Sequence, residues 1–237
     1  MIEVEGLFKN FDDFEALRGL QLKVNKGSIY GLIGVNGSGK TTLIKHLTGV
    51  YRENEGNVKM DGQDVYDNIA IKEKLGIIPD ELYFYSGYNL KSEAKFYKQI
   101  YPNWNEERYH ELVSAFELPE TKKLSKFSKG MQKQAAFVLT MSTMPEYLIL
   151  DEPVDGLDPI VRRKVWKYIV ADVAERQMTV LVSSHNLREL EGLVDTIGIM
   201  YKGAIKFEHT DLDELESKGG LMNLEDLFFD EMEGGIK

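Results

Sequence analysis

Short runs of apolar residues alternate with polar positions near the N-terminus, in the pattern of β-strands. Such runs occupy residues 2–4, 20–24 and 28–33, and an Asn-Lys-Gly turn precedes the last of them. A helical pattern follows at 40–49, and residues 56–62 have the glycines and the alternation of a hairpin. The first third of the chain therefore predicts a β-rich unit with one helix.

The middle and the C-terminal part of the chain differ in character. From about 81 to 143 the pattern is helical, with Pro102 and Pro119 as breaks. Beyond it come a strand pattern, a helix pattern and two further strand patterns, at 147–150, 159–176, 179–182 and 196–200. Strands that alternate with helices are typical of a mainly parallel sheet.

These patterns predict an α/β fold with a mainly parallel sheet core, an N-terminal antiparallel β portion and an inserted helical subdomain. We expect the core to comprise residues 1–80 and 146–237, and the helical subdomain to comprise 81–145. A chain of 237 residues is long enough for about one to two domains.

Composition narrows the class of protein further. Hydrophobic residues make up 43% of the chain and charged residues 29%, which is typical of a globular protein. The absence of cysteine excludes a disulfide scaffold, a thiolate metal site and a cysteine nucleophile. The longest stretch without Asp, Glu, Lys or Arg, residues 27–39, is too short to span a membrane. The first residues contain no secretory signal, so we expect a cytoplasmic location.

The net charge of −10 is concentrated near the C-terminus. Residues 208–237 carry ten acidic side chains and two lysines, which leaves the rest of the chain almost neutral. We expect an acidic helical tail at 208–237, either as a solvated face or as a docking surface. Neither part has the basic excess that nucleic-acid binding requires, so no nucleic-acid partner is expected.

A glycine-rich loop carries the first candidate site. Residues 34–41, Gly-Val-Asn-Gly-Ser-Gly-Lys-Thr, match the phosphate-loop pattern G-x-x-x-x-G-K-[ST] between an apolar strand and a helix. The glycines let backbone N–H groups surround phosphate oxygens, and the helix N-terminus favours an anion. Lys40 is expected to neutralise the β- and γ-phosphates, and the Thr41 hydroxyl to bind Mg²⁺. The motif predicts a nucleoside-triphosphate site in a P-loop NTPase fold.

Two adjacent carboxylates supply the second half of this site. The apolar strand 147–150 ends in Asp151 and Glu152, and the alternation of a strand predicts that they point to opposite sides. Asp151 is expected to hold Mg²⁺ through water, and Glu152 to face the water that attacks the γ-phosphate. His185 follows the next strand at the same edge of the sheet, and we expect it to contact the γ-phosphate or to orient that water.

Three further segments make the chain resemble the ATP-binding subunits of ABC transporters, over essentially its whole length. Phe11 stands where the family has an aromatic residue that stacks on adenine, and residues 128–132 stand where it has its signature sequence. Asp-Gly-Leu-Asp at 155–158 is similar to the family's D-loop, which touches the opposite subunit. Aromatic-rich pieces between 88 and 104 resemble a bacterial exporter-type branch, encoded beside antibiotic-peptide resistance and stress operons.

The resemblance, together with the motifs above, implies a set of residues that bind ATP and Mg²⁺. The residues expected to bind ATP are Phe11, Gly34, Asn36, Gly37, Ser38, Gly39, Lys40, Thr41, Thr42, Ser128 and Gly130. The residues expected to bind the metal are Thr41, Asp151 and Asp80. Those expected to act in catalysis are Glu152, His185 and Lys40.

Two motifs depart from the family's pattern. The common signature is Leu-Ser-Gly-Gly-Gln, whereas Phe-Ser-Lys-Gly-Met at 127–131 keeps only the serine and the second glycine. In the family these two, here Ser128 and Gly130, contact the γ-phosphate from across the dimer. Asp80 replaces the family's Gln-loop glutamine, and a carboxylate can bind Mg²⁺ but cannot donate hydrogen bonds as an amide does.

The aromatic residues that follow Asp80 allow two interpretations. Tyr83, Phe84, Tyr85 and Tyr88 are either core of the helical subdomain or anchors on an exposed surface. In the family this region borders the groove that receives a coupling helix of the membrane subunit.

The resemblance implies an ATPase that powers export through a separate transmembrane permease, on the inner face of the cell membrane. A second ATP-binding subunit, identical or different, would complete the composite ATP sites. The alternative is a soluble ABC ATPase that acts on ribosomes or DNA. The single cassette, the lack of a long coiled coil between Thr41 and Ser128, and the acidic charge all disfavour it. A GTPase is disfavoured because Asn25-Lys26 does not continue as Asn-Lys-x-Asp.

Overall fold

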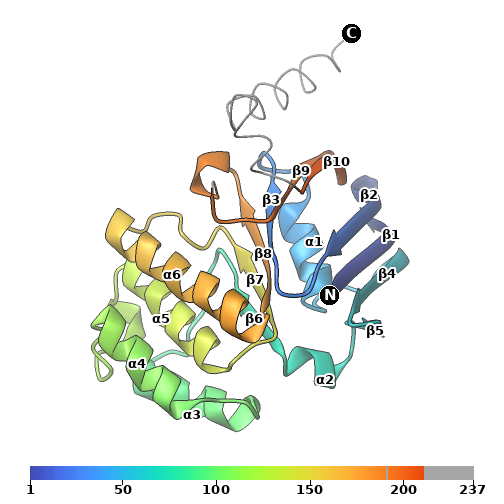
Figure 1. Ribbon diagram of the computed structural model, residues 1–237. Coiled ribbons are helices and arrows are strands. Elements are labelled where there is room, and N and C mark those ends of the chain that lie inside the picture. The colour runs from blue at the N-terminus through green and yellow to red at the C-terminus, as the bar shows by residue number, and fades with distance from the viewer. Residues whose placement is uncertain (191, 211–237) are drawn as a thin grey trace.

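The computed structural model describes residues 1–190 and 192–210 of the chain. Figure 1 shows a smaller sheet at the N-terminal side, helix α1 between it and a larger sheet, and further helices on the other side of the larger sheet. No helix within the described ranges has both the length and the apolar character needed to cross a membrane.

The N-terminal part of the chain forms an antiparallel sheet with the strand order β2-β1-β4-β5. Its strands are β1 (Ile2–Phe11), β2 (Phe14–Val24), β4 (Glu55–Met60) and β5 (Gln63–Asp64). The apolar residues of these strands face inwards, and Ile2, Val4 and Leu7 of β1 are fully buried. The expected antiparallel β portion is confirmed.

The larger sheet has six strands in the order β10-β9-β3-β8-β7-β6. They are β3 (Ile29–Ile33), β6 (Leu75–Ile78), β7 (Tyr147–Asp151), β8 (Thr179–Ser184), β9 (Thr196–Tyr201) and β10 (Ala204–His209). All neighbouring pairs are parallel except β9 and β10. Every residue of β3, β7 and β8 is buried, as a parallel sheet covered on both faces requires.

The helices gather mostly on one face of the larger sheet (Figure 1). They are α1 (Lys40–Leu47), α2 (Ile69–Lys72), α3 (Leu90–Ile100), α4 (Glu106–Phe116), α5 (Lys129–Ser142) and α6 (Pro159–Arg176). Short 3₁₀ turns occupy Leu124–Lys126 and Leu187–Glu189. Polar side chains cap the starts of α3, α4, α5 and α6 by accepting hydrogen bonds from backbone N–H groups of the first turn. These caps explain where the helices begin.

Two hydrophobic clusters lie on opposite faces of the larger sheet. Ile29 and Ile33 of β3 belong to the cluster that includes α3 to α6. Tyr30 and Leu32, the residues that alternate with them, belong to the cluster with α1 and the antiparallel sheet. The strands thus join both halves of the core, and their C-terminal ends come together at one edge.

Two strands were not predicted from the sequence. β6 has only four residues, one of them glycine, and β10 pairs with β9 across a two-residue turn at Lys202 and Gly203. Glu208 and His209 belong to β10, so the first residues of the expected acidic helical tail are a strand instead. The remainder of that tail, 211–237, lies outside the described residues.

Candidate nucleotide-binding site

The phosphate loop joins the end of β3 to the start of α1 in a backbone conformation that favours glycine. Gly37 has a φ of 81° and Gly39 a φ of 110°. A side chain at Gly39 would also meet Met200 Cε at 2.7 Å and the Ala16 carbonyl oxygen at 2.9 Å. The loop therefore needs glycine at this position for two independent reasons, backbone angle and space.

Lys40 begins α1 and is buried at the base of the loop. Its Nζ donates a hydrogen bond to the Gly34 carbonyl oxygen at 2.5 Å and lies 3.9 Å from Glu152 Oε1. Burial lowers the pKa of the Lys40 ammonium, although the carboxylates of Glu152 and Asp151 oppose that shift. The loop thus holds a cation in position before a phosphate group binds. Burial has already removed much of the water around this cation.

A cavity of about 190 Å³ lies in front of this loop. It is lined by Val35, Asn36, Gly37, Gly39, Lys40, Thr41, Thr42, Asp80, Asp151 and Glu152. The loop residues and the Asp151–Glu152 pair, which are more than 100 positions apart in the sequence, therefore face one space, which we call the phosphate cavity. Gly34 adjoins it through the hydrogen bond that its carbonyl oxygen accepts from Lys40, and Ser38 is a buried residue of the loop itself.

Asp151 is the last residue of β7 and is held by hydroxyl groups from two other elements. Its Oδ1 accepts a hydrogen bond from Ser183 Oγ at 2.5 Å, and its Oδ2 accepts one from Thr41 Oγ1 at 3.2 Å. The expectation that Asp151 and Glu152 point to opposite sides is wrong. The strand ends at Asp151, and Glu152 has a φ of 48°, so the alternation of the strand no longer applies. Both carboxylates line the phosphate cavity.

Glu152 lies between two basic groups. Its Oε2 is 2.9 Å from His185 Nδ1, while its Oε1 faces Lys40. The Glu152 side chain is 15% exposed and that of His185 is 54% exposed, so the pair connects the interior of the cavity with solvent. A carboxylate held by an imidazole in this way can polarise a water molecule or accept its proton.

Phe11, Ser128 and Gly130 lie outside the phosphate cavity. Phe11, at the end of β1, is 39% exposed, with its ring edge-on to Tyr51 at 5.4 Å between centroids. Ser128 caps α5 by accepting a hydrogen bond from the Met131 N–H at 3.2 Å. Gly130 is in the first turn of the same helix, and we refer to residues 127–131 as the signature segment.

The aromatic residues after Asp80 divide between core and surface. Tyr83 is 84% exposed, and Tyr85 and Tyr88 are also exposed, whereas Phe84 packs against the helical cluster. The interpretation of all four as core is therefore wrong for the three tyrosines. Asp80 itself lines the phosphate cavity, and its Oδ1 is 3.8 Å from Lys133 Nζ.

Three residues that contact the predicted site residues were not predicted from the sequence. Ser183 orients Asp151 and also accepts a hydrogen bond from the Glu152 N–H at 3.2 Å. Lys133 contacts the Glu152 carbonyl oxygen, and Tyr51 contacts Phe11. Only Ser183 had a sequence signal, since it directly precedes Ser184 and His185 at the end of β8. The other two reach the site through packing that no local motif encodes.

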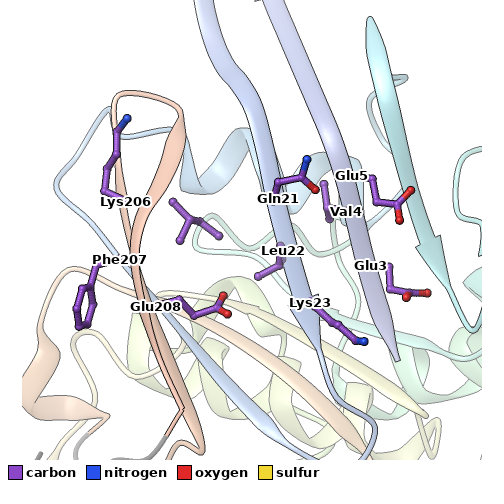
Figure 2. A pocket seen from close by; sticks show the side chains of 10 residues that line it. Glu3, Val4, Glu5, Gln21, Leu22, Lys23, Lys206, Phe207 and Glu208 are labelled. Carbon is purple, nitrogen blue, oxygen red and sulfur yellow. The ribbon is translucent and has the colours of Figure 1, made fainter.

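A larger hollow of about 540 Å³ lies elsewhere, between β10 and the β1–β2 pair (Figure 2). In Figure 2 the Glu208 side chain extends from β10 towards β2, whereas the Phe207 ring points away from β2. Its charged residues are of both signs and come from strand surfaces, namely Glu3, Glu5, Lys23, Lys206 and Glu208. The smaller phosphate cavity has convergent glycines, a buried lysine and paired acids, so chemistry rather than volume identifies it as the candidate site.

Comparison with known proteins shows the family to which the chain belongs. The ABC transporter family matches residues 17–155 of the chain. The ATP-binding protein YtrB of Bacillus subtilis is 34% identical over 218 residues, which cover 92% of this chain and 74% of YtrB. The bacitracin transport ATP-binding protein BcrA of Bacillus licheniformis is 33% identical, with coverages of 92% and 72%. The daunorubicin resistance ATP-binding protein DrrA3 of Streptomyces coeruleorubidus is 31% identical, with 92% and 71% covered.

Solved structures lead to the same group of proteins. The ATP-binding subunit of an ABC transporter superimposes with a TM-score of 0.87 and is 26% identical, with 97% of this chain and 98% of that one covered. A dimeric bacterial ABC transporter cassette, 20% identical, has a TM-score of 0.80 over 89% of this chain and 98% of its own, which shows the common fold. The predicted P-loop NTPase fold is thereby confirmed, and the chain belongs to the ABC transporter family as an ATP-binding, ATP-hydrolysing subunit.

Proposed function

We propose that this chain hydrolyses ATP in the phosphate cavity and thereby powers export through a separate transmembrane permease. The observation that carries the proposal is the convergence of the glycine loop, Lys40 and the Asp151–Glu152 pair on one cavity. Relatives named for bacitracin transport and daunorubicin resistance support the exporter branch. The cargo itself is chosen by the permease.

The residues of the cavity divide the work of hydrolysis among them. Lys40 and the backbone N–H groups of the loop bind the β- and γ-phosphates and neutralise their charge. Glu152 polarises the attacking water, and His185 holds its carboxylate in place from the solvent side. Because these groups are already in contact, little reorganisation is needed when ATP arrives.

Mg²⁺ fits the donors that the cavity offers. The Thr41 hydroxyl and the Asp151 carboxylate converge at 3.2 Å, and both are hard oxygen ligands of the kind this ion prefers. Thr41 would bind it directly and Asp151 through water, with Asp80 as a further acidic neighbour. When bound, the ion supplies neutralisation of the phosphate charge.

A second ATP-binding subunit completes the site. Ser128 lies at the N-terminus of α5, where hydroxyl and N–H groups favour an anion, and Gly130 lets the backbone approach closely. In the proposed dimer, each ATP is enclosed between the phosphate cavity of one chain and the signature segment of the other. Closed and open dimers differ in their contacts with the γ-phosphate, so hydrolysis shifts the population towards the open form.

The permease binds the helical subdomain, in our proposal, and so holds the chain on the inner face of the membrane. The exposed ring of Tyr83 and its neighbours Tyr85 and Tyr88 support this, because aromatic residues are frequent anchors of interfaces. The alternative of a ribosome- or DNA-directed ATPase is less well supported, since a net charge of −10 opposes binding to nucleic acid.

Membrane co-purification tests the proposal. A tagged chain is expected to leave detergent-solubilised membranes together with an integral membrane protein, and the reconstituted pair is expected to hydrolyse ATP faster than the chain alone. Tyr83→Ser is expected to weaken the association, while Ile69→Ser, at a similarly exposed residue of α2, serves as the matched control. Recovery of the chain with ribosomes or DNA, and with no membrane protein, would contradict the proposal.

A further inference from the structure

One lysine of helix α5 connects this helix with Glu152, the residue that directly follows β7. Lys133 Nζ donates a hydrogen bond to the Glu152 carbonyl oxygen at 2.8 Å. The same nitrogen lies 3.8 Å from Asp80 Oδ1, and the Lys133 side chain is only 12% exposed. A single, largely buried ammonium group therefore contacts two residues that line the phosphate cavity.

The backbone of Glu152 needs such support. Its φ of 48° is in the left-handed region, where a residue with a side chain is strained. On one side its N–H is held by Ser183, through the hydroxyl at 3.2 Å and the carbonyl oxygen at 3.3 Å. On the other side its carbonyl oxygen accepts the bond from Lys133 and a longer one, of 3.4 Å, from the Asp155 N–H. The charged donor is the stronger of these two.

Asp80 gives this largely buried lysine a partner of opposite charge. An ammonium group with little exposure to water is costly unless an anion lies near it. The Asp80 side chain is 57% exposed and lies at the mouth of the cavity, so it can attract Lys133 without being buried itself. Asp80, expected from the sequence only as a metal ligand, thus has a second role.

We infer that Lys133 is a positioning residue for ATP hydrolysis: it fixes the left-handed backbone of Glu152, and Asp80 holds Lys133 in place. The inference rests on the proposed role of Glu152. Lys133 contacts the main chain of Glu152 and not the reacting atoms, so it acts through the direction of the Glu152 carboxylate towards Lys40 and His185. The position of α5 relative to the core thereby influences the orientation of the Glu152 carboxylate.

Removal of the charged donor tests the inference. Lys133→Met is expected to lower kcat about tenfold, the size of one charge-assisted hydrogen bond, with KM and the affinity for ATP unchanged. Lys133→Arg keeps a cationic donor and is expected to restore most of the turnover. Lys95→Met, at an exposed lysine of α3, is the matched control and is expected to behave as the original chain. A purely structural role for Lys133 would change thermal stability without this split between kcat and KM.

Combination with other variants shows whether Lys133 acts through Glu152. In the Glu152→Gln background, Lys133→Met is expected to cause no further loss, because the group it positions is already gone. Asp80→Asn is expected to lower kcat about two- to threefold, and to have a smaller effect once Lys133 is replaced, because only its contribution to the metal site then remains. Full additivity in either pair, or turnover of Lys133→Met within twofold of the original chain, would overturn the inference.

If Lys133→Met does not fold, a second variant tests the same inference. Lys133→Gln keeps a hydrogen-bond donor but is one atom shorter and loses the charge, and it is expected to lose at least about threefold in kcat. Normal turnover of this folded variant would also overturn the inference. The proposed function is tested separately: if Glu152→Gln alone retains normal turnover, the role of Glu152 fails, whereas loss in Glu152→Gln without loss in Lys133→Met removes only the inference about Lys133.

Discussion

The phosphate cavity and the signature segment are proposed to bind the same kind of ligand, but they are built differently. In the cavity, functional side chains hold one another: Thr41 and Ser183 donate to Asp151, and His185 pairs with Glu152. In the signature segment, Ser128 caps its own helix. A side chain at the neighbouring Gly130 would find its nearest atoms 3.7 Å or more away.

This difference indicates how the work is divided between chains. Groups that are already bonded to each other can bind a phosphate and position water within one subunit. A helix N-terminus with an exposed serine and an open glycine binds an anion only when another molecule presents one. We therefore propose that the cavity is a nucleotide site by itself, and that the signature segment is the second half of a site on a partner subunit.

The largest effect is expected from variants of the signature segment. Ser128→Arg or Gly130→Asp should abolish hydrolysis while each chain still binds ATP, because the added charged side chain blocks the approach to the partner's γ-phosphate. Steady-state hydrolysis and nucleotide titration measure the two properties. Mixing such a variant with Lys40→Ala chains should restore at most about half the activity, since one of the two sites in a symmetric dimer is then intact.

Ser125→Arg is the matched control for these variants. Ser125 is exposed in the 3₁₀ turn just before the signature segment, and the same substitution there should leave turnover unchanged. Unimpaired hydrolysis by Gly130→Asp, at equal ATP affinity, would show that the division between cavity and signature segment does not exist in this chain.

Glu152→Gln should have the next largest effect. The amide keeps the shape of the side chain but loses the charge that polarises water, so turnover should fall about 100-fold or more. ATP should still bind, and an ATP-bound dimer should accumulate in size-exclusion chromatography. Glu146→Gln, just before the same strand and in an exposed ion pair with Lys74, should leave turnover unaltered. Near-normal hydrolysis by Glu152→Gln would mean that the cavity lacks its proposed base.

Phe11→Ala should weaken ATP binding by about 1–2 kcal/mol, because stacking of a base on an aromatic ring contributes about this much. Phe11→Tyr should bind as well as the original chain. Phe14→Ala, at an aromatic residue of the same hairpin that is 63% exposed, provides the comparison. Equal losses for Phe11→Ala and Phe14→Ala in a nucleotide titration would show that Phe11 does not stack on adenine.

The smallest effect is expected far from both regions. The Asn105 side-chain oxygen accepts a hydrogen bond from the Arg108 N–H at 2.9 Å and so caps α4. Asn105→Ala should therefore lower the free energy of unfolding by about 1 kcal/mol. Denaturant titration measures this change, with the exposed loop residue Asn103 as the site of a control alanine. ATP turnover should be unchanged, and a clear loss of turnover would extend the functional machinery into α4.

Local sequence patterns predicted most of the fold and, within the site, the phosphate loop. The phosphate loop could be predicted because one short motif specifies turn, cation and helix start together. The helix at Pro159–Arg176 could be predicted because Asp158 and Pro159 form a cap and a first turn that suit a helix start. These features depend on neighbours in sequence.

The remaining features depend on neighbours in space. Ser183 and Lys133 bind the backbone of Glu152, where the chain leaves β7. Because these tertiary contacts determine the direction of the Glu152 side chain, the alternation of a strand did not predict it. β6 and β10 are edge strands that pair with one neighbour each, and short edge strands have weak local patterns. Neither the contact of Lys133 with Glu152 nor that of Tyr51 with Phe11 has a sequence signature.

The division of β3 between two hydrophobic clusters has a consequence for hydrogen exchange. Ile29 and Ile33 are anchored on the helical side, and Tyr30 and Leu32 on the side of α1. Opening either half of the core alone leaves the other half of this central strand packed. Backbone amides of β3 should therefore exchange with deuterium only when the whole domain unfolds, while those of the edge strand β6 exchange earlier through local opening.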